Sequence, residues 1–130
     1  MGMMKNLMIG IHKRTGDRFA GMDLLYLTTV GAQSGKERVS PVARFADGEG
    51  AWLVVASNNG AERNPAWYHN LKAHPDQVWI EHGGNKRRAT PQELTGADRD
   101  AALQRIIAAQ PRFAGYEKKT SRKLPIIRLS

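Results

Sequence analysis

Apolar and polar residues alternate along the chain in short blocks that are separated by turn signals. Runs such as LLYLTTV and AWLVVAS are rich in the β-branched and aromatic side chains that strands favour. On this pattern we predict six strands, at residues 24–30, 38–46, 51–57, 77–82, 86–93 and 124–129. Pro41 indicates an edge or a bulge for the second strand, and the DGEG turn at 47–50 predicts a hairpin. The short turns favour a mostly antiparallel sheet that closes as a small β-barrel with helical insertions.

Two helices are predicted between these strands, and a third segment is partly helical. Asn64 is a good N-cap and Pro65 suits the first helical position, so a helix is expected up to about His74. A second helix is predicted over residues 95–110, which begin with the capping-box pattern TGAD. The basic segment at 112–123 is expected to be partly helical. The fold class is therefore mainly β with α insertions.

Length and composition indicate one globular domain over residues 1–130. Hydrophobic residues make up 41% of the chain and charged residues 25%, which excludes a wholly disordered or fibrous protein. Cysteine is absent, so disulfides, cysteine nucleophiles and thiolate metal sites are excluded. No apolar run has the length of a membrane span or of a signal-peptide core. A cytoplasmic protein is the expectation from these observations.

The charge of the chain is uneven, with a formal net charge of +8. Residues 1–85 hold nine basic and eight acidic side chains, whereas residues 86–130 hold eleven and four. The first hypothesis is therefore an anionic partner, such as a nucleic acid, a phosphorylated ligand or a membrane surface. Only Phe113 and Tyr116 interrupt the basic run at 112–123 as aromatic residues, and RNA modules need aromatic platforms on strands. No nucleic-acid partner is expected, although a nucleic-acid module stays open as an alternative with a steep salt dependence.

The motifs with candidate chemistry argue against several enzyme classes. GAQSGK at 31–36 has one residue too few for a phosphate-binding P-loop and Glu37 where Ser or Thr is needed. It is predicted as a hairpin loop whose backbone N–H groups can approach an anion, with charge from Lys36 and Arg38. No spacing of His12, His69, His74 and His82 indicates a metal site, and no nucleophile turn is present.

Trp67 and Tyr68 have two interpretations on sequence alone. They fit a site where an aromatic ligand stacks, and they fit equally the core face of an amphipathic helix.

Three segments together resemble a known family. They are Arg14-Thr15-Gly16 leading to LLYLTTVGAQSGKERVSPV, then VVASNNGAERNPAWYHNLKAHP, then YEKKTSRKLPIIRL. The chain resembles the deazaflavin-dependent nitroreductase family of the flavin/deazaflavin oxidoreductase superfamily over about residues 12–130. The resemblance implies a split β-barrel, in agreement with the strand pattern.

The resemblance also implies an activity. Family members bind coenzyme F-420, an 8-hydroxy-5-deazaflavin with a phosphate-linked oligoglutamate tail. The reduced coenzyme passes a hydride from C5 to an electron-poor acceptor, which is a quinone, a nitroaromatic compound or an activated alkene. The coenzyme does the difficult step, and the protein positions the ring and excludes water.

Site residues follow from the resemblance position by position. The phosphate and tail would be held by Gln33, Ser34, Gly35, Lys36, Arg38, Val39, Ser40, Pro41 and Val42. The edge of the deazaflavin would be lined by Val55, Ala56, Ser57 and Asn58. The ring would be contacted by Ala66, Trp67, Tyr68, His69 and Asn70, at a helix start whose dipole favours an anionic ring. The substrate pocket would include Ala43, Phe113 and Tyr116, and either Tyr116 or Ser57 would orient the substrate or relay a proton.

The chain departs from the family pattern at three places. Gln33 stands where the family often has Lys, with Lys36 and Arg63 as candidates to replace its charge. Ala43 stands where a bulkier residue often occurs, which implies a larger pocket. The apolar segment before His12 is expected to cover the substrate, to pack on the barrel or to meet a membrane surface.

Several alternatives remain open at this point. The same barrel binds FMN or haem in other proteins, and a non-enzymatic carrier of a deazaflavin or a lipid fits the pattern too. The expected partner is a small-molecule electron acceptor, with peripheral membrane contact as a further option. Both a monomer and a homodimer are compatible with the sequence.

Overall fold

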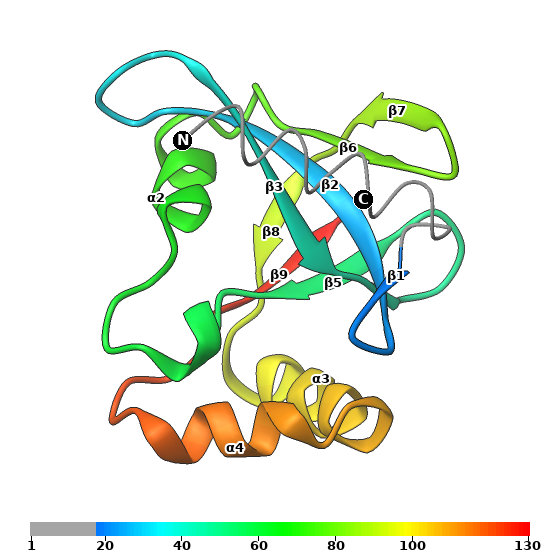
Figure 1. The fold of residues 1–130 in the computed structure, drawn as a ribbon, viewed down its shortest axis with the longest axis vertical. Coiled ribbons are helices and arrows are strands. Elements are labelled where there is room, and N and C mark those ends of the chain that lie inside the picture. Colours follow the sequence, from blue (N-terminus) through cyan, green and yellow to red (C-terminus); the bar gives the residue numbers. More distant parts are fainter. Residues whose placement is uncertain (1–17) are drawn as a thin grey trace.

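The computed structural model describes residues 18–130, which form short strands and helices in the order shown in Figure 1. The strands are β1 (Arg18–Phe19), β2 (Met22–Val30), β3 (Glu37–Ala43), β4 (Phe45–Ala46), β5 (Trp52–Val55), β6 (Trp79–His82), β7 (Asn85–Arg88), β8 (Pro91–Glu93) and β9 (Ile126–Leu129). The helices are α2 (Ala66–Ala73), α3 (Gly96–Ala109) and α4 (Arg112–Lys119), with a 3-10 turn, η1 (Asn58–Gly60).

The strands form two antiparallel sheets. In the first, β2 pairs with β1, β3 and β6, and β6 pairs with β7; in the second, the order is β4-β5-β9-β8. The register brings Thr29 of β2 opposite Arg38 of β3, and Leu25 opposite Val42. The sheets do not close into one ring among the described residues, so the barrel is split. The predicted fold class, mainly β and mostly antiparallel with inserted helices, is confirmed.

Two apolar clusters fill the spaces on either side of the second sheet. The first joins β2 and β6 of one sheet to β5, β9 and α2, and its centre includes Leu27, Val54 and Ile127, all fully buried. The second joins the other face of β5 and β9 to α3 and α4, through Leu53, Ile106 and Phe113. Successive strand residues point to opposite faces, so β5 and β9 contribute to both clusters. As Figure 1 shows, α2 lies at one end of the sheets and α3 and α4 at the other.

Two predicted strands are each divided, because the chain passes from one sheet to the other within them. The run at 38–46 breaks at Arg44, whose side chain donates to the Leu24 carbonyl and lies over Trp52, with 5.2 Å between the guanidinium carbon and the ring centroid. The run at 86–93 breaks after Ala89, whose N–H donates to the carbonyl of Val78 (2.9 Å), the residue before β6 of the first sheet. Thr90 then bonds Ser130, beyond β9 of the second sheet. A periodic pattern does not show such a change of sheet.

One predicted helix cap was wrong, and the other was right in position but not in its side-chain bond. Helix α2 begins at Ala66, with Pro65 at the N-cap position, and the side chain of Asn64 instead accepts a bond from Arg122 (2.5 Å). Thr95 is at the N-cap of α3, but it makes no side-chain cap bond.

No helix among residues 18–130 is both long enough and apolar enough to span a membrane.

Candidate functional site

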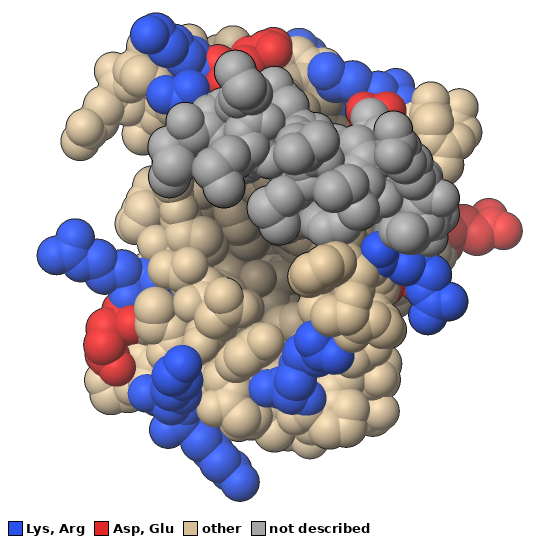
Figure 2. Space-filling model, in the orientation of Figure 1, with Lys and Arg blue, Asp and Glu red and all other residues tan. Residues whose placement is uncertain are grey.

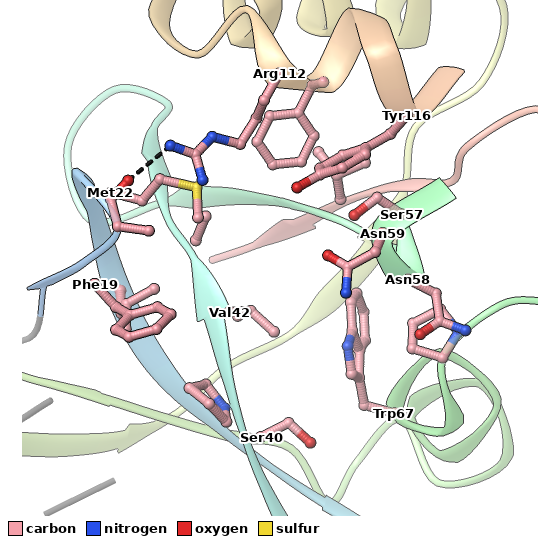
Figure 3. Close-up of a pocket in the computed structure, with 17 residues that line it drawn as sticks. Phe19, Met22, Ser40, Val42, Ser57, Asn58, Asn59, Trp67, Arg112 and Tyr116 are labelled. Atoms are coloured by element: carbon pink, nitrogen blue, oxygen red, sulfur yellow. Dashed lines mark hydrogen bonds between the residues drawn. The ribbon is translucent and has the colours of Figure 1, made fainter. Parts of the chain in front are cut away.

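A cavity of about 570 Å³ opens between β3, the loop after β5, the start of α2 and helix α4. Figure 3 shows the side chains that line it, and Figure 2 shows that this face is hollowed and largely uncharged at its centre, with Lys and Arg at its margin. Ten residues predicted from the sequence line it, namely Ser40, Pro41, Val42, Ala43, Val55, Ser57, Asn58, Trp67, Phe113 and Tyr116. Residues from four predicted segments therefore meet at one cavity.

The structure also adds residues that the sequence pattern did not indicate. The β1–β2 hairpin contributes Phe19, Ala20, Met22 and Leu24, and three further residues are Asn59, Pro65 and Arg112. The hairpin is far from the other segments in sequence, so no local pattern predicts its place. Asn59 did carry a signal, because the Asn58-Asn59-Gly60 sequence consists of residue types that tolerate a left-handed backbone. Their φ angles are 47°, 56° and 81°.

The loop at 31–36 lies beyond the cavity, at the far end of β2 and β3. Its backbone is closed by bonds from the Gly31 N–H to Lys36 (2.8 Å) and from the Gly35 N–H to Gly31 (2.9 Å). The Ser34 hydroxyl accepts from the Lys36 N–H (3.2 Å). A β-carbon at Gly31 would overlap with that hydroxyl, so a larger residue there would require the Ser34 side chain to move. The side chains of Gln33 and Lys36 are exposed.

Arg38 is exposed and lies outside the cavity, but its side chain is on the face of the sheet that α2 covers. Directly paired residues of antiparallel strands point to the same side, so Arg38 shares the face of Thr29. The Thr29 hydroxyl accepts a bond from Asn70 of α2 (3.2 Å), which identifies that face as the one under α2. Ser40 and Val42 follow Arg38 at two-residue intervals, so the three side chains form one row that leads into the cavity.

The side chain of Asn70 forms hydrogen bonds within the fold and does not line the cavity. Its side chain is buried, and its amide donates to Thr29 while its oxygen accepts from the Ala32 N–H (2.9 Å). It therefore fixes α2 against β2 and against the start of the 31–36 loop.

The structure places the other predicted residues outside the cavity wall. Val39 is half-buried on the opposite face of β3, Ala56 is fully buried, and Ala66 and His69 are exposed. The Tyr68 hydroxyl donates to Glu93 of β8 (2.8 Å), which also accepts from Lys72 (3.0 Å). Burial raises the pKa of Tyr68, and the hydrogen bond to Glu93 raises it further by a smaller amount. Of Trp67 and Tyr68, only Trp67 is both a core residue and a cavity residue.

Arg122 holds the loop that carries Ser57 and Asn58 to the cavity. Its guanidinium donates to the carbonyl oxygens of Ser57 (3.0 Å), Ala61 (2.9 Å) and Arg63 (3.2 Å) and to the side chain of Asn64. A guanidinium has five fixed donors, which suits it to bind several carbonyls of one loop. In the sequence Arg122 belongs to a basic run that is typical of a solvated face, so its pattern gives no sign of this role.

The cavity has aromatic walls and a few polar groups. Trp67, Phe113 and Tyr116 offer ring surfaces, and the hydroxyl groups of Ser40, Ser57 and Tyr116 offer hydrogen bonds. Such a lining fits a planar ring system with polar edges. The row from Val42 to Arg38 fits an anionic extension of that ring system, so the residues fit a deazaflavin with a charged tail.

The described residues offer no metal site. Within residues 18–130, no group of three or more His, Asp or Glu side chains is arranged to hold a metal ion. His12 and the apolar segment before it lie outside the described residues, so the expectations for that segment stay predictions.

Comparisons with known proteins agree on one family. The family model described as F-420H(2)-dependent quinone reductase matches residues 5–130. An F-420H(2)-dependent quinone reductase of Mycobacterium tuberculosis is 37% identical over 125 residues, which cover 93% of this chain and 83% of the relative.

Two solved structures are similar in fold and sequence. A structure of an F-420-H2 dependent reductase (FDR-A) is 34% identical, has a TM-score of 0.73, and the match covers 82% of this chain and 93% of that one. A domain-swapped dimer is 30% identical, with a TM-score of 0.74 and coverage of 98% and 96%. These matches favour coenzyme F-420 over the FMN and haem alternatives. The chain belongs to the F-420H(2)-dependent quinone reductase family and is an oxidoreductase whose cofactor is coenzyme F-420.

Proposed function

We propose that the protein transfers a hydride from reduced coenzyme F-420 to a quinone or another electron-poor organic acceptor, such as a nitroaromatic compound or an activated alkene. The observation that carries this proposal is the cavity with aromatic walls, from which a row of β3 side chains leads to Arg38. The coenzyme, when bound, supplies the hydride chemistry. The residues of the chain bind, orient and shield the reactants.

In this proposal residues of β3, of the 31–36 loop and of the start of α2 would hold the coenzyme. Arg38 and Lys36 bind the phosphate and the tail, because a guanidinium forms paired bonds to phosphate and carboxylate oxygens. Val42 and Trp67 contact the ring, and the nearby N-terminus of α2 contributes a partial positive charge. Asn70 acts indirectly by holding the 31–36 loop.

The acceptor then occupies the part of the cavity under α4. Phe113 and Tyr116, from one face of α4, contact its ring, and the Tyr116 or Ser57 hydroxyl bonds the oxygen that gains negative charge. Addition of one hydride and one proton converts a quinone into its hydroquinone. A positioned hydroxyl favours this step because it stabilises the developing charge and passes on the proton.

We also infer a cytoplasmic, single-domain protein, with peripheral membrane contact as an open expectation. The similar domain-swapped dimer supports a test for a homodimer by light scattering.

Binding of the coenzyme tests the proposal most directly. Reduced coenzyme is expected to quench tryptophan fluorescence, since Trp67 lines the cavity. Arg38→Ala is expected to weaken binding by about 1.5–3 kcal/mol, the range for a hydrogen bond to a charged group. Lys86→Ala is the matched control, because Lys86 is an exposed cation on β7, at the opposite edge of the sheet from β3.

Turnover separates the enzyme from the alternatives. The wild type is expected to oxidise the reduced coenzyme when a naphthoquinone is the acceptor. The absorbance of the coenzyme measures this oxidation. Absence of quenching at low salt contradicts the proposal, and binding without turnover across quinones and nitroaromatic compounds favours the carrier. If Arg38→Ala and Lys86→Ala weaken coenzyme binding equally, Arg38 does not have the role assigned to it.

A further inference from the structure

Arg112 is the only charged side chain among the described residues that line the cavity. It is the first residue of α4, and it lines the cavity together with Phe113 and Tyr116 of the same helix. Figure 3 shows Arg112 on the α4 side of the cavity, with Ser40 on the opposite side. Arg112 is exposed to solvent, so its charge borders the cavity at the rim.

Among residues 18–130, the hydrogen bond that the Arg112 guanidinium makes uses only one of its nitrogens. One nitrogen, Nη2, donates to the Ala20 carbonyl (2.7 Å). No carboxylate of residues 18–130 forms an ion pair with it, since the ion pairs of these residues involve other arginines and Lys72. A guanidinium has five N–H donors, so several remain.

The position of Arg112 is also unfavourable for its own helix. The N-terminus of a helix carries a partial positive charge, which repels a cation. The first turn of α4 contains no acidic residue that would offset this repulsion. The intrinsic stability of α4 therefore does not explain an arginine here. Its bond to the Ala20 carbonyl attaches the β1–β2 turn, and an anionic ligand in the cavity would offset the repulsion.

Arg112 lies on the side of the cavity opposite to the groups proposed to bind the coenzyme tail. The groups proposed for the tail, Arg38 and Lys36, lie at the far end of β3, beyond Ser40. Arg112 instead borders the part under α4, on the same helix as Phe113 and Tyr116. This position favours the second reactant over the coenzyme tail as its partner.

We propose that Arg112 selects electron acceptors that carry an anionic oxygen group, such as a carboxylate, a sulfonate or an ionised hydroxyl, on an aromatic or quinone ring. The inference rests on the proposed function of the same cavity. The ring packs on Phe113 and Tyr116, and the anionic oxygens accept paired bonds from the guanidinium, as carboxylates do from arginine elsewhere.

A binding test uses probes that cannot be reduced. The affinity of naphthalene-2-carboxylate is compared with that of its neutral amide, in the complex with oxidised coenzyme and at low salt. The wild type is expected to prefer the carboxylate by about tenfold, and Arg112→Gln to lose nearly all of this preference. High salt is expected to reduce the preference in the wild type.

Two control variants separate the guanidinium of Arg112 from the surrounding positive charge and from the attachment of the β1–β2 turn. Lys118→Gln removes a cation from an exposed site on α4 that does not line the cavity, so it tests the general positive field. Gln110→Ala removes the other bond from this region to the β1–β2 turn, Gln110 to the Gly21 carbonyl (3.1 Å), and keeps Arg112. Both variants are expected to keep the preference for the carboxylate.

Turnover gives the second measurement. The ratio of kcat/KM for a naphthoquinone sulfonate to that for the unsubstituted naphthoquinone is expected to fall about tenfold in Arg112→Gln, mainly through KM for the sulfonate. An unchanged ratio, or an equal fall in Lys118→Gln or Gln110→Ala, overturns the inference about Arg112. Such a result leaves the proposed function intact, provided that coenzyme binding and reduction of the neutral quinone persist.

Discussion

Three consecutive residues at the rim of the cavity have a left-handed backbone, and Gly60 is the most constrained of them. A β-carbon at Gly60 would lie 3.0 Å from Lys119 Cβ and 3.1 Å from the Tyr116 carbonyl oxygen. The turn η1 therefore packs against α4 without space for a side chain. This contact joins the loop that carries Ser57 to the helix that carries Tyr116. These two residues are the candidates for relaying the proton.

Gly60→Ala tests this contact against the backbone effect alone. Gly83→Ala is the control, because Gly83 also has a positive φ (59°) but nothing within 4 Å of an added β-carbon. The control is expected to lower the free energy of unfolding by about 1 kcal/mol. Gly60→Ala is expected to lower it by about 1–3 kcal/mol more, since a tight contact must shift. Urea unfolding measures both, and equal losses would contradict the close packing.

At the scale of elements, α2 is attached to the first sheet through a buried polar side chain. Asn70 bonds both Thr29 of β2 and the N–H of Ala32 in the loop beyond β2. Removal of such a side chain leaves buried polar groups without partners. The geometry of the 31–36 loop, which carries Lys36, thus depends on a residue of α2.

Asn70→Ala is expected to weaken coenzyme binding as well as folding. The expected loss in the free energy of unfolding is about 1–3 kcal/mol, and the dissociation constant of reduced coenzyme is expected to rise several-fold, because the loop loses its attachment. Gln77→Ala is the control, because it removes an amide side chain in the turn after α2. Fluorescence titration measures the affinity; an unchanged affinity in a folded Asn70→Ala protein would show that the loop does not need this attachment.

At the scale of the whole molecule, much of the basic surplus of residues 86–130 joins distant parts of the chain. Arg87 donates to Gly50 (2.7 Å), Arg99 to Leu124 (2.9 Å), and Arg122 to several carbonyls of the 56–64 loop. Arg105 and Arg128 bond the carboxylate of Asp47. These arginines satisfy carbonyl and carboxylate oxygens within the fold, which explains a basic composition without a nucleic-acid partner.

Asp47 makes the stability of the fold depend on pH. It lies in the turn before β5 and accepts bonds from Arg128 of β9 (2.8 Å) and Arg105 of α3 (3.1 Å). The bond from Arg128 holds the pKa of Asp47 below its ordinary value of 3.8, with Arg105 adding to the effect and burial opposing it. A lowered pKa in the folded state stabilises the fold above the ordinary value, and this stabilisation is lost as the pH falls through the folded-state pKa.

Asp47→Asn is accordingly expected to be less stable than the wild type at neutral pH. At acid pH this difference in stability is expected to be smaller. The expected difference is about 0.5–1 kcal/mol at pH 7, because the arginines are partly exposed to solvent. The difference is expected to shrink below about pH 4. Glu49→Gln, in the same turn and exposed, is the control. Thermal unfolding at a series of pH values measures the effect; a difference independent of pH would exclude the ionised carboxylate as its cause.

The sequence by itself determined the strands, the helices and the mostly antiparallel character of the sheets. Local periodicity and turn residues carry this information, as in the strand at 24–30 and the hairpin turn at 47–50. It also identified ten residues of the cavity, from Ser40 to Tyr116, but only through the resemblance to a family. Periodicity alone left Trp67 open between core and ligand.

The tertiary structure decided what depends on contacts between distant segments. The change of sheet at Arg44, the clamp formed by Arg122 and the place of the β1–β2 hairpin at the cavity all join residues that are far apart in the chain. No local pattern encodes such a contact, because the same arginine in sequence fits a solvated face, a carbonyl clamp or a ligand site. Burial and the geometry of partners separate these roles, and for Arg112 they place the side chain in the cavity lining.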